Sequence, residues 1–149
     1  ALNHRFRLLP AVEDIDRHSY GTIAYGASIA ILLALFWPEQ PLAVAAGVLV
    51  MALGDGLAGL VGPQLRSPRW RVLGQGKSLA GTLAMAGGAL VVLILLQLMA
   101  QSQGIAAPAW PYLIGIALLA TALEQGSSFG IDNLSVPLIA GLLWQHWTP

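Results

Sequence analysis

Five long apolar segments, separated by short polar loops, restrict what this chain can fold into. A helix that crosses a lipid bilayer needs about 20 mostly apolar residues. The segments that reach or approach this length are 20–37, 41–62, 79–100, 110–123 and 134–147. Only 9% of the residues are charged, against about a quarter in ordinary soluble domains. We therefore predict an all-α fold, a polytopic transmembrane helix bundle of about five spans that forms one membrane-embedded domain over residues 1–149.

The charged residues divide between the two ends of such a bundle. Five passes through a bilayer place residues 1–19, 63–78 and 124–133 on the same side. All seven basic residues lie there: Arg5, Arg7, Arg17, Arg66, Arg69, Arg71 and Lys77. The loops on the opposite side carry Glu39 as their only charge. The positive-inside rule makes the basic side cytoplasmic, and we expect the active face there.

Several classes of protein are excluded. The chain contains no cysteine, which excludes disulfides, thiolate catalysis and cysteine-based metal sites. The formal net charge is zero, so the total charge indicates nothing about partners. The first residues do not form a cleavable signal. Because the sequence begins with Ala1 and not Met, we expect further residues upstream.

Asp55 is the most informative residue, because it lies inside the second apolar segment. It is two helical turns from the cytoplasmic end, or roughly 10 Å deep. A carboxylate at that depth costs several kcal/mol unless it is paired, binds a metal or faces water. The surrounding Gly54, Gly56, Gly59 and Gly62 have a plain explanation in close helix packing, but the aspartate does not. We predict that Asp55 binds magnesium, which prefers one or two carboxylates together with phosphates and water.

The stretch GQGKSLAGT partly matches the phosphate-binding loop of soluble NTPases. That loop requires a glycine where this sequence has Arg71. It also follows a buried β-strand, and SPRWRVLGQ has too few apolar residues to form one. We reject this interpretation.

A helix end offers another phosphate site. Ser78 is predicted to cap the third apolar segment. A helix N-terminus presents free N–H groups and partial positive charge, which suit an anion, and Lys77 adds a full charge. We therefore predict that Lys77 and Ser78, beside Gly76 and Gly81, hold a phosphate. The alternative is an ordinary positively charged loop before a capped helix.

A third polar cluster precedes the fifth segment and contains Glu124, Asp132 and Asn133. It lies on the same face as Asp55 and Lys77, which favours a second metal or nucleotide contact. The alternative is that Asp132 or Asn133 caps the fifth helix and Glu124 lies at the interface.

With these elements in place, the chain resembles the dolichol kinase/phytol kinase family of integral membrane enzymes, and most of all its phytol kinase branch. The matching stretches are RHSYGTIAYG, GDGLAGLVG, KSLAGTLAM and E…GIDNLSVPL, in the family's order and over nearly the whole chain. The resemblance implies Mg²⁺-dependent transfer of the γ-phosphate of CTP to a long-chain isoprenoid alcohol such as phytol. It also implies a bacterial inner membrane or a photosynthetic membrane as the location, and an oligomer is compatible with it. We therefore expect CTP, a prenyl alcohol and the bilayer as partners, and no nucleic acid.

The resemblance also implies roles for individual residues. Asp55 and Lys77 would be catalytic, and Asp55, Asp132 and Glu124 would bind the metal. The implied nucleotide-binding residues are Gly54, Asp55, Gly59, Gly62, Lys77, Ser78, Gly81 and Asn133. This sequence departs from the family in two respects. It lacks the additional spans and the basic element that members carry upstream, and it has Pro63 and Gln64 where a glycine is common.

Two other functions remain open from the residues alone. A membrane cytidylyltransferase of the CDP-lipid type would use the same nucleotide and metal but attack the α-phosphate. A small transporter or assembly factor would use Asp55 as an ion or proton site.

Overall fold

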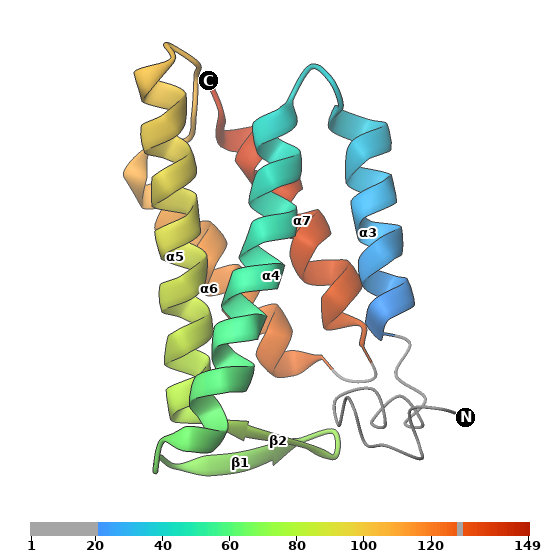
Figure 1. Cartoon of the computed structure of the whole chain (residues 1–149), viewed down its shortest axis with the longest axis vertical. Coiled ribbons are helices and arrows are strands. Elements are labelled where there is room, and N and C mark those ends of the chain that lie inside the picture. Colours follow the sequence, from blue (N-terminus) through green and yellow to red (C-terminus); the bar gives the residue numbers. More distant parts are fainter. Residues whose placement is uncertain (1–20, 128–129) are drawn as a thin grey trace, which may run out of the picture.

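A computed structural model describes residues 21–127 and 130–149 of the chain. In these residues it contains five α-helices and one antiparallel pair of strands (Figure 1). The elements are α3 (Gly21–Phe36), α4 (Pro41–Gln64), β1 (Arg69–Val72), β2 (Gln75–Ser78), α5 (Leu79–Ser102), α6 (Trp110–Gly126) and α7 (Asp132–Trp147). The three N-terminal arginines and the first residues of RHSYGTIAYG lie outside the described residues.

Each predicted apolar segment corresponds to one helix. The predicted helical fold is confirmed, and most boundaries agree within a few residues. The second helix does not end before Pro63 as expected, because Pro63 lies inside its last turn. At the other end of this helix, Pro41 occupies the first turn, where a missing N–H costs no intrahelical hydrogen bond.

In the part of the chain that the structure describes, two helices are long and apolar enough to cross a membrane, namely α4 and α5 with 24 residues each. At 1.5 Å per residue each is about 36 Å long, which exceeds the roughly 30 Å of a hydrocarbon core. Only 28% of the apolar window of α4 and 39% of that of α5 are buried inside the protein. Large apolar side chains such as Leu60, Leu83 and Leu95 are therefore exposed on their outer faces. The helices α3, α6 and α7 are shorter, with 16 or 17 residues.

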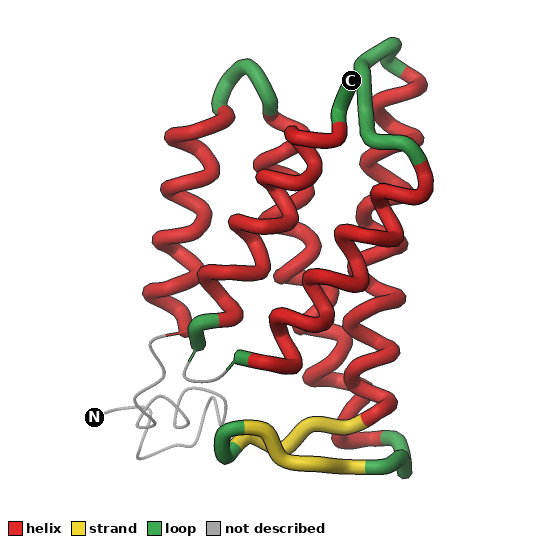
Figure 2. Tube along the Cα trace, turned by 180° about the vertical axis from the view of Figure 1, so that it is seen from behind, coloured by secondary structure: helices red, strands yellow, loops and turns green. Residues whose placement is uncertain are grey.

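The helix α4 is the centre of the bundle and packs most extensively against α5 and α7. Small residues allow these close contacts. A Cβ on Gly47 would lie 2.4 Å from the carbonyl oxygen of Pro137 in α7, and one on Gly54 would lie 2.5 Å from the sulfur of Met85 in α5. The largest fully buried side chain is Trp144 of α7. Around this core the helices run side by side, and Figure 2 shows the same arrangement from behind.

The two strands form a hairpin that lies across one end of the bundle (Figures 1 and 2). Val72 pairs with Gln75, so Leu73 and Gly74 make a two-residue turn, and both have positive φ, 49° and 85°. Positive φ at both central residues is the feature of the tight turns that match the twist of a hairpin. Strand β1 is mostly exposed. The prediction that this stretch forms no buried strand therefore holds, but an exposed hairpin was not predicted.

The hairpin, the C-terminal end of α6 and the start of α7 lie at the same end of the bundle, whereas the loop from α3 to α4 and the C-terminus lie at the other (Figure 1). Arg66, Arg69, Arg71 and Lys77 are therefore at one end and Glu39 at the other. This is the separation of charge that the sequence predicted for the described part of the chain.

Candidate functional site

A cavity of about 620 Å³ lies between the hairpin and the ends of α4, α5 and α6. Its wall includes Asp55, Lys77 and Glu124, which come from three separate segments of the chain. The remaining lining residues are Ala58, Gly59, Gly62, Pro63, Arg69, Trp70, Arg71, Gly76, Ser78, Gly81, Thr82 and Gln125. Seven of the ten predicted site residues thus line one cavity. Gly54, Asp132 and Asn133 are not in its wall.

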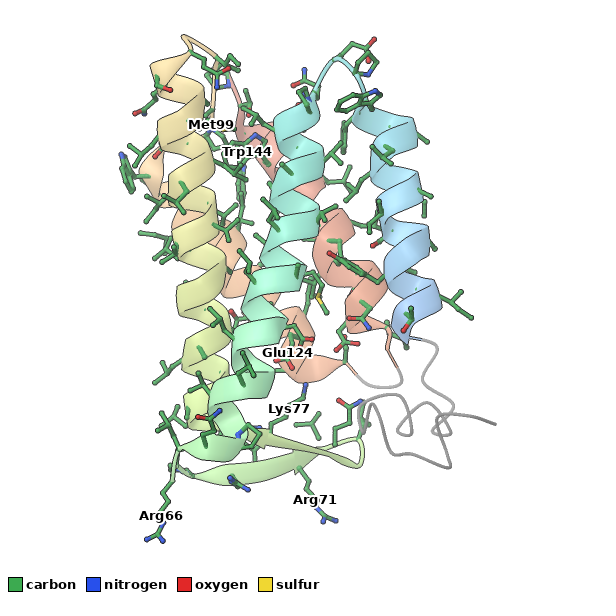
Figure 3. The ribbon with its side chains drawn as sticks, viewed as in Figure 1. Arg66, Arg71, Lys77, Met99, Glu124 and Trp144 are labelled. Atoms are coloured by element: carbon green, nitrogen blue, oxygen red, sulfur yellow. The ribbon has the colours of Figure 1, made fainter. Side chains whose placement is uncertain are left out.

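Lys77 is the second-to-last residue of β2, and this position on the strand brings it to the cavity. It pairs with Trp70 of β1, and paired residues project from the same face of a sheet. Both line the cavity. Figure 3 shows the Lys77 side chain directed toward α6, whereas the guanidinium groups of Arg66 and Arg71 point away from the helices.

Lys77 and Glu124 form an ion pair at the wall of the cavity (Figure 3). The ammonium nitrogen Nζ of Lys77 donates to Oε1 of Glu124 and also to its main-chain carbonyl oxygen, the latter at 3.0 Å. The two side chains are 9% and 8% exposed, so this pair is largely shielded from solvent. From the sequence, Lys77 was expected at a phosphate and Glu124 at a metal or nucleotide, and their contact with each other was not predicted.

Gln125 completes this group, although no sequence pattern had marked it. Its Nε2 donates to Oε2 of Glu124 at 2.6 Å. Both carboxylate oxygens of Glu124 therefore accept a hydrogen bond, one from Lys77 and one from Gln125. A glutamine beside a buried carboxylate has no sequence pattern of its own, and only its place next to Glu124 could have indicated this role.

Asp55 lies on the cavity wall one turn of α4 before Gly59. It is partly buried and within electrostatic reach of Glu124, Asp132 and Lys77. The two acids oppose a negative charge on Asp55 and the lysine favours it. A carboxylate in this position is available to a cation or to a polar ligand in the cavity.

The carboxylates fit a magnesium ion that also has ligands outside the protein. Among the described residues, no three His, Asp or Glu side chains are close enough to form a complete metal cluster. Magnesium does not require one, because it is commonly held by one or two carboxylates together with water and substrate phosphates. Asp55 faces the cavity. Within residues 21–127 and 130–149, Oδ1 of Asp132 is buried without a hydrogen-bond partner, which is compatible with a cation nearby.

Ser78 caps α5 as predicted, since its Oγ accepts from the N–H of Gly81 at 3.1 Å. The expectation that this helix start presents free N–H groups was wrong. The N–H of Leu79 donates to Pro68 at 3.0 Å and that of Ala80 to Oγ of Ser67 at 3.1 Å. An anion in the cavity would therefore contact side chains at this helix start and not free main-chain N–H groups. A hydroxyl that accepts one hydrogen bond can still donate its own hydrogen, so Ser78 remains suitable.

The predicted glycines divide into two groups. Gly62 and Gly81 allow α4 and α5 to approach around the Ser78 cap, since a Cβ on either would lie 3.0–3.1 Å from Ser78 Oγ. Gly54 packs against Met85 away from the cavity, which supports the packing explanation for it. A Cβ on Gly59 would meet nothing within 4 Å. The place of Gly59 in the cavity wall is thus independent of helix packing.

Asp132 and Asn133 begin α7. The alternative that one of them caps this helix was wrong, because the N-cap position is Ile131 and no side chain caps it. Asp132 is in the first turn, where a negative charge is favourable.

Comparison with known proteins gives relatives but no structural match. No family model matches the sequence, and no solved structure matches it. The chain is 38% identical over 143 residues to a phytol kinase of Synechocystis, which covers 95% of this chain and 60% of that protein. It is 29% identical over 128 residues to a probable chloroplastic phytol kinase of Glycine max (83% of this chain, 40% of the relative). It is 26% identical over 122 residues to a dolichol kinase of Arabidopsis thaliana (81% and 21%). The chain thus spans 60% or less of the length of these relatives.

Proposed function

Because this chain belongs to the phytol kinase and dolichol kinase family, we propose that it is a membrane-embedded kinase that transfers a phosphoryl group from CTP to a long-chain isoprenoid alcohol. The alcohol would be phytol or a related prenyl alcohol. The observation that carries the proposal is the cavity in which Lys77, Ser78 and Asp55 meet. Phosphoryl transfer requires mainly positioning and charge neutralisation from the protein, and these three side chains can supply both.

In this mechanism the hydroxyl oxygen of the alcohol attacks the γ-phosphorus of CTP. A new oxygen–phosphorus bond forms, the bond to the β–γ bridging oxygen breaks, and CDP leaves. The hydroxyl proton passes to water or to a carboxylate of the cluster. Lys77 would hold the transferred phosphate and the Ser78 hydroxyl would donate to it, while Gly59 and Gly76 leave room at the wall.

Asp55 and Asp132 would hold Mg²⁺. Glu124 would be a further ligand only if its carboxylate released Lys77 or Gln125, to which it is hydrogen-bonded. When bound, the metal would neutralise charge on the phosphates. Asn133 in the first turn of α7 remains a proposed nucleotide contact.

The bilayer would accommodate the alcohol's chain. The exposed apolar faces of α4 and α5 support a position within the bilayer, with all five helices as spans of a polytopic bundle. The hairpin end, with its basic residues, would face the cytoplasm. The alcohol would lie between helices with its hydroxyl at this end, next to the cavity.

The experiment that tests the proposal uses membranes containing the protein, phytol, and CTP labelled separately at the α- and γ-phosphates. We expect label in the lipid from the γ-position only. Label from the α-position would instead identify a cytidylyltransferase. No label from either position would favour a binding or transport function.

A further inference from the structure

We infer that Glu124 is a positioning residue that sets Lys77 on the nucleotide phosphates, and that it does not bind the metal. The inference rests on the proposed function and assigns a specific task to one of its acids. It follows from the hydrogen bonds of Glu124, from the flexibility of a lysine side chain, and from the sign of the charges involved.

The hydrogen bonds of Glu124 leave little room for a metal ion. Oε1 contacts the Lys77 ammonium and Oε2 accepts from Nε2 of Gln125. A cation on Oε1 would lie directly beside the ammonium group, and the two positive charges would repel each other strongly at low dielectric. A cation on Oε2 would displace the amide of Gln125, whose hydrogen bond of 2.6 Å is charge-assisted and so stronger than a neutral one. Asp55 has neither obstacle among the described residues.

Lys77 needs an external constraint if it is to hold a phosphate in one place. A lysine ammonium sits on a flexible four-carbon chain, and an isolated two-stranded hairpin is only marginally stable. Glu124 belongs to α6 and is buried, so it offers a fixed point. The two acceptors of Glu124, one on the side chain and one on the main chain, hold the ammonium at the cavity wall. In protein kinases an ion pair between a strand lysine and a helix glutamate has the same task.

The sign of the charges makes the inference testable. A negative charge next to the phosphates of CTP opposes binding, so neutralising Glu124 would tighten binding if charge alone mattered. If Glu124 positions Lys77, the same change weakens binding. The two effects have opposite directions, and a weakening identifies positioning.

Lys77 is the only lysine in this sequence, which gives a direct probe of its environment. We propose to measure the rate at which an amine-reactive ester acylates Lys77 in the purified protein, by mass spectrometry of the peptide, with increasing CTP in EDTA and then in Mg²⁺. CTP should slow the acylation of wild-type Lys77. In Glu124→Gln, the CTP concentration that gives half-protection should rise about tenfold, because the ion pair with the carboxylate is replaced by a weaker hydrogen bond from the ammonium to an uncharged amide oxygen. In Gln125→Ala it should rise about threefold, as one supporting bond is lost.

The matched control is Glu39→Gln, which removes an exposed glutamate at the opposite end of the bundle and should leave half-protection unchanged. An unchanged or lower value in both Glu124→Gln and Gln125→Ala, with protection intact in the wild type, would overturn the inference. A rise that occurs only in Mg²⁺ would overturn it as well and assign Glu124 to the metal. If CTP does not protect wild-type Lys77 at all, the proposed nucleotide site itself is wrong, and the inference with it.

Discussion

Lys77 and Glu124 lie 47 residues apart in the sequence and are joined by two hydrogen bonds from one ammonium group. This contact ties the β-hairpin to α6 at the wall of the cavity (Figure 3). The strand residue and the helix residue are thereby fixed relative to each other. The helix α6 is anchored in the apolar core by Leu113, Ile116 and Ala120, whereas β1 of the hairpin is mostly exposed.

The first prediction concerns the stability of this ion pair. Removing one partner of a buried pair leaves an uncompensated charge, so Lys77→Met should lower the free energy of unfolding by about 3 kcal/mol. The double variant Lys77→Met/Glu124→Leu should recover most of this loss, because no buried charge remains. Denaturant titration of the purified protein in detergent measures both. Glu124→Leu alone is the third variant needed for the comparison. If the double variant lost as much free energy of unfolding as Lys77→Met and Glu124→Leu lose in total, the two residues would not interact.

A second prediction concerns Asp55. Asp55→Asn retains the size of the side chain and removes its charge, so kinase activity should fall at least about 100-fold. Expression in membranes should hold or improve, because a charge within the bilayer is costly. The measurement is turnover against Mg²⁺ concentration, with immunoblotting of the membrane fraction. Near-normal turnover at limiting Mg²⁺ would remove Asp55 from the mechanism.

A third prediction separates packing glycines from cavity glycines. Gly47→Ala places a Cβ 2.4 Å from the Pro137 carbonyl oxygen. A main-chain atom cannot move aside cheaply, so this variant should lose about 1–3 kcal/mol of stability. Gly59→Ala meets nothing within 4 Å, and its thermal stability should be unchanged or slightly higher. The added methyl projects from a wall residue of the cavity, so the KM for CTP should rise in Gly59→Ala alone. Equal stability of the two variants would contradict the packing of α4 against α7.

The positions of the helices were largely predictable from sequence, and the contacts between them were not. The lengths of the apolar runs, together with Pro41, predicted the five helical segments, and Ser78 predicted where α5 begins. The exposed hairpin was missed because its strands have no apolar face that would mark them. Its turn depends on Leu73 adopting a positive φ of 49°, which a leucine rarely does.

The candidate site was predicted as a set of residues but not as a set of contacts. Asp55, Lys77 and Glu124 stood out because charges are rare in such a chain, and they do line one cavity. The ion pair between two of them was not predicted, because a sequence does not show which charge lies opposite which. The engaged N–H groups at the start of α5 depend on Ser67 and Pro68, whose positions are set by the unpredicted hairpin.

A fourth prediction concerns the orientation of the bundle in the membrane. The chain contains no cysteine, so single cysteines report without background. Arg66→Cys, at a side chain that points away from the helices (Figure 3), should react with a membrane-impermeant maleimide only from the cytoplasmic side. Ser102→Cys, exposed at the other end of α5, should react only from the opposite side. Both reacting from one side would mean that α5 does not cross the membrane.

The central claim is that the cavity at Lys77 holds the phosphates of the nucleotide. Lys77 and Arg66 belong to the same basic segment, but Lys77 faces the cavity and Arg66 points away from the helices. The most direct measurement compares kcat/KM for CTP in Lys77→Ala and Arg66→Ala. We expect Lys77→Ala to fall at least about 100-fold, since a positive charge on the transferring phosphate is lost in the transition state, and Arg66→Ala to remain within about threefold of the wild type. Small and equal losses in the two variants would contradict the account and would require the phosphates to be held elsewhere.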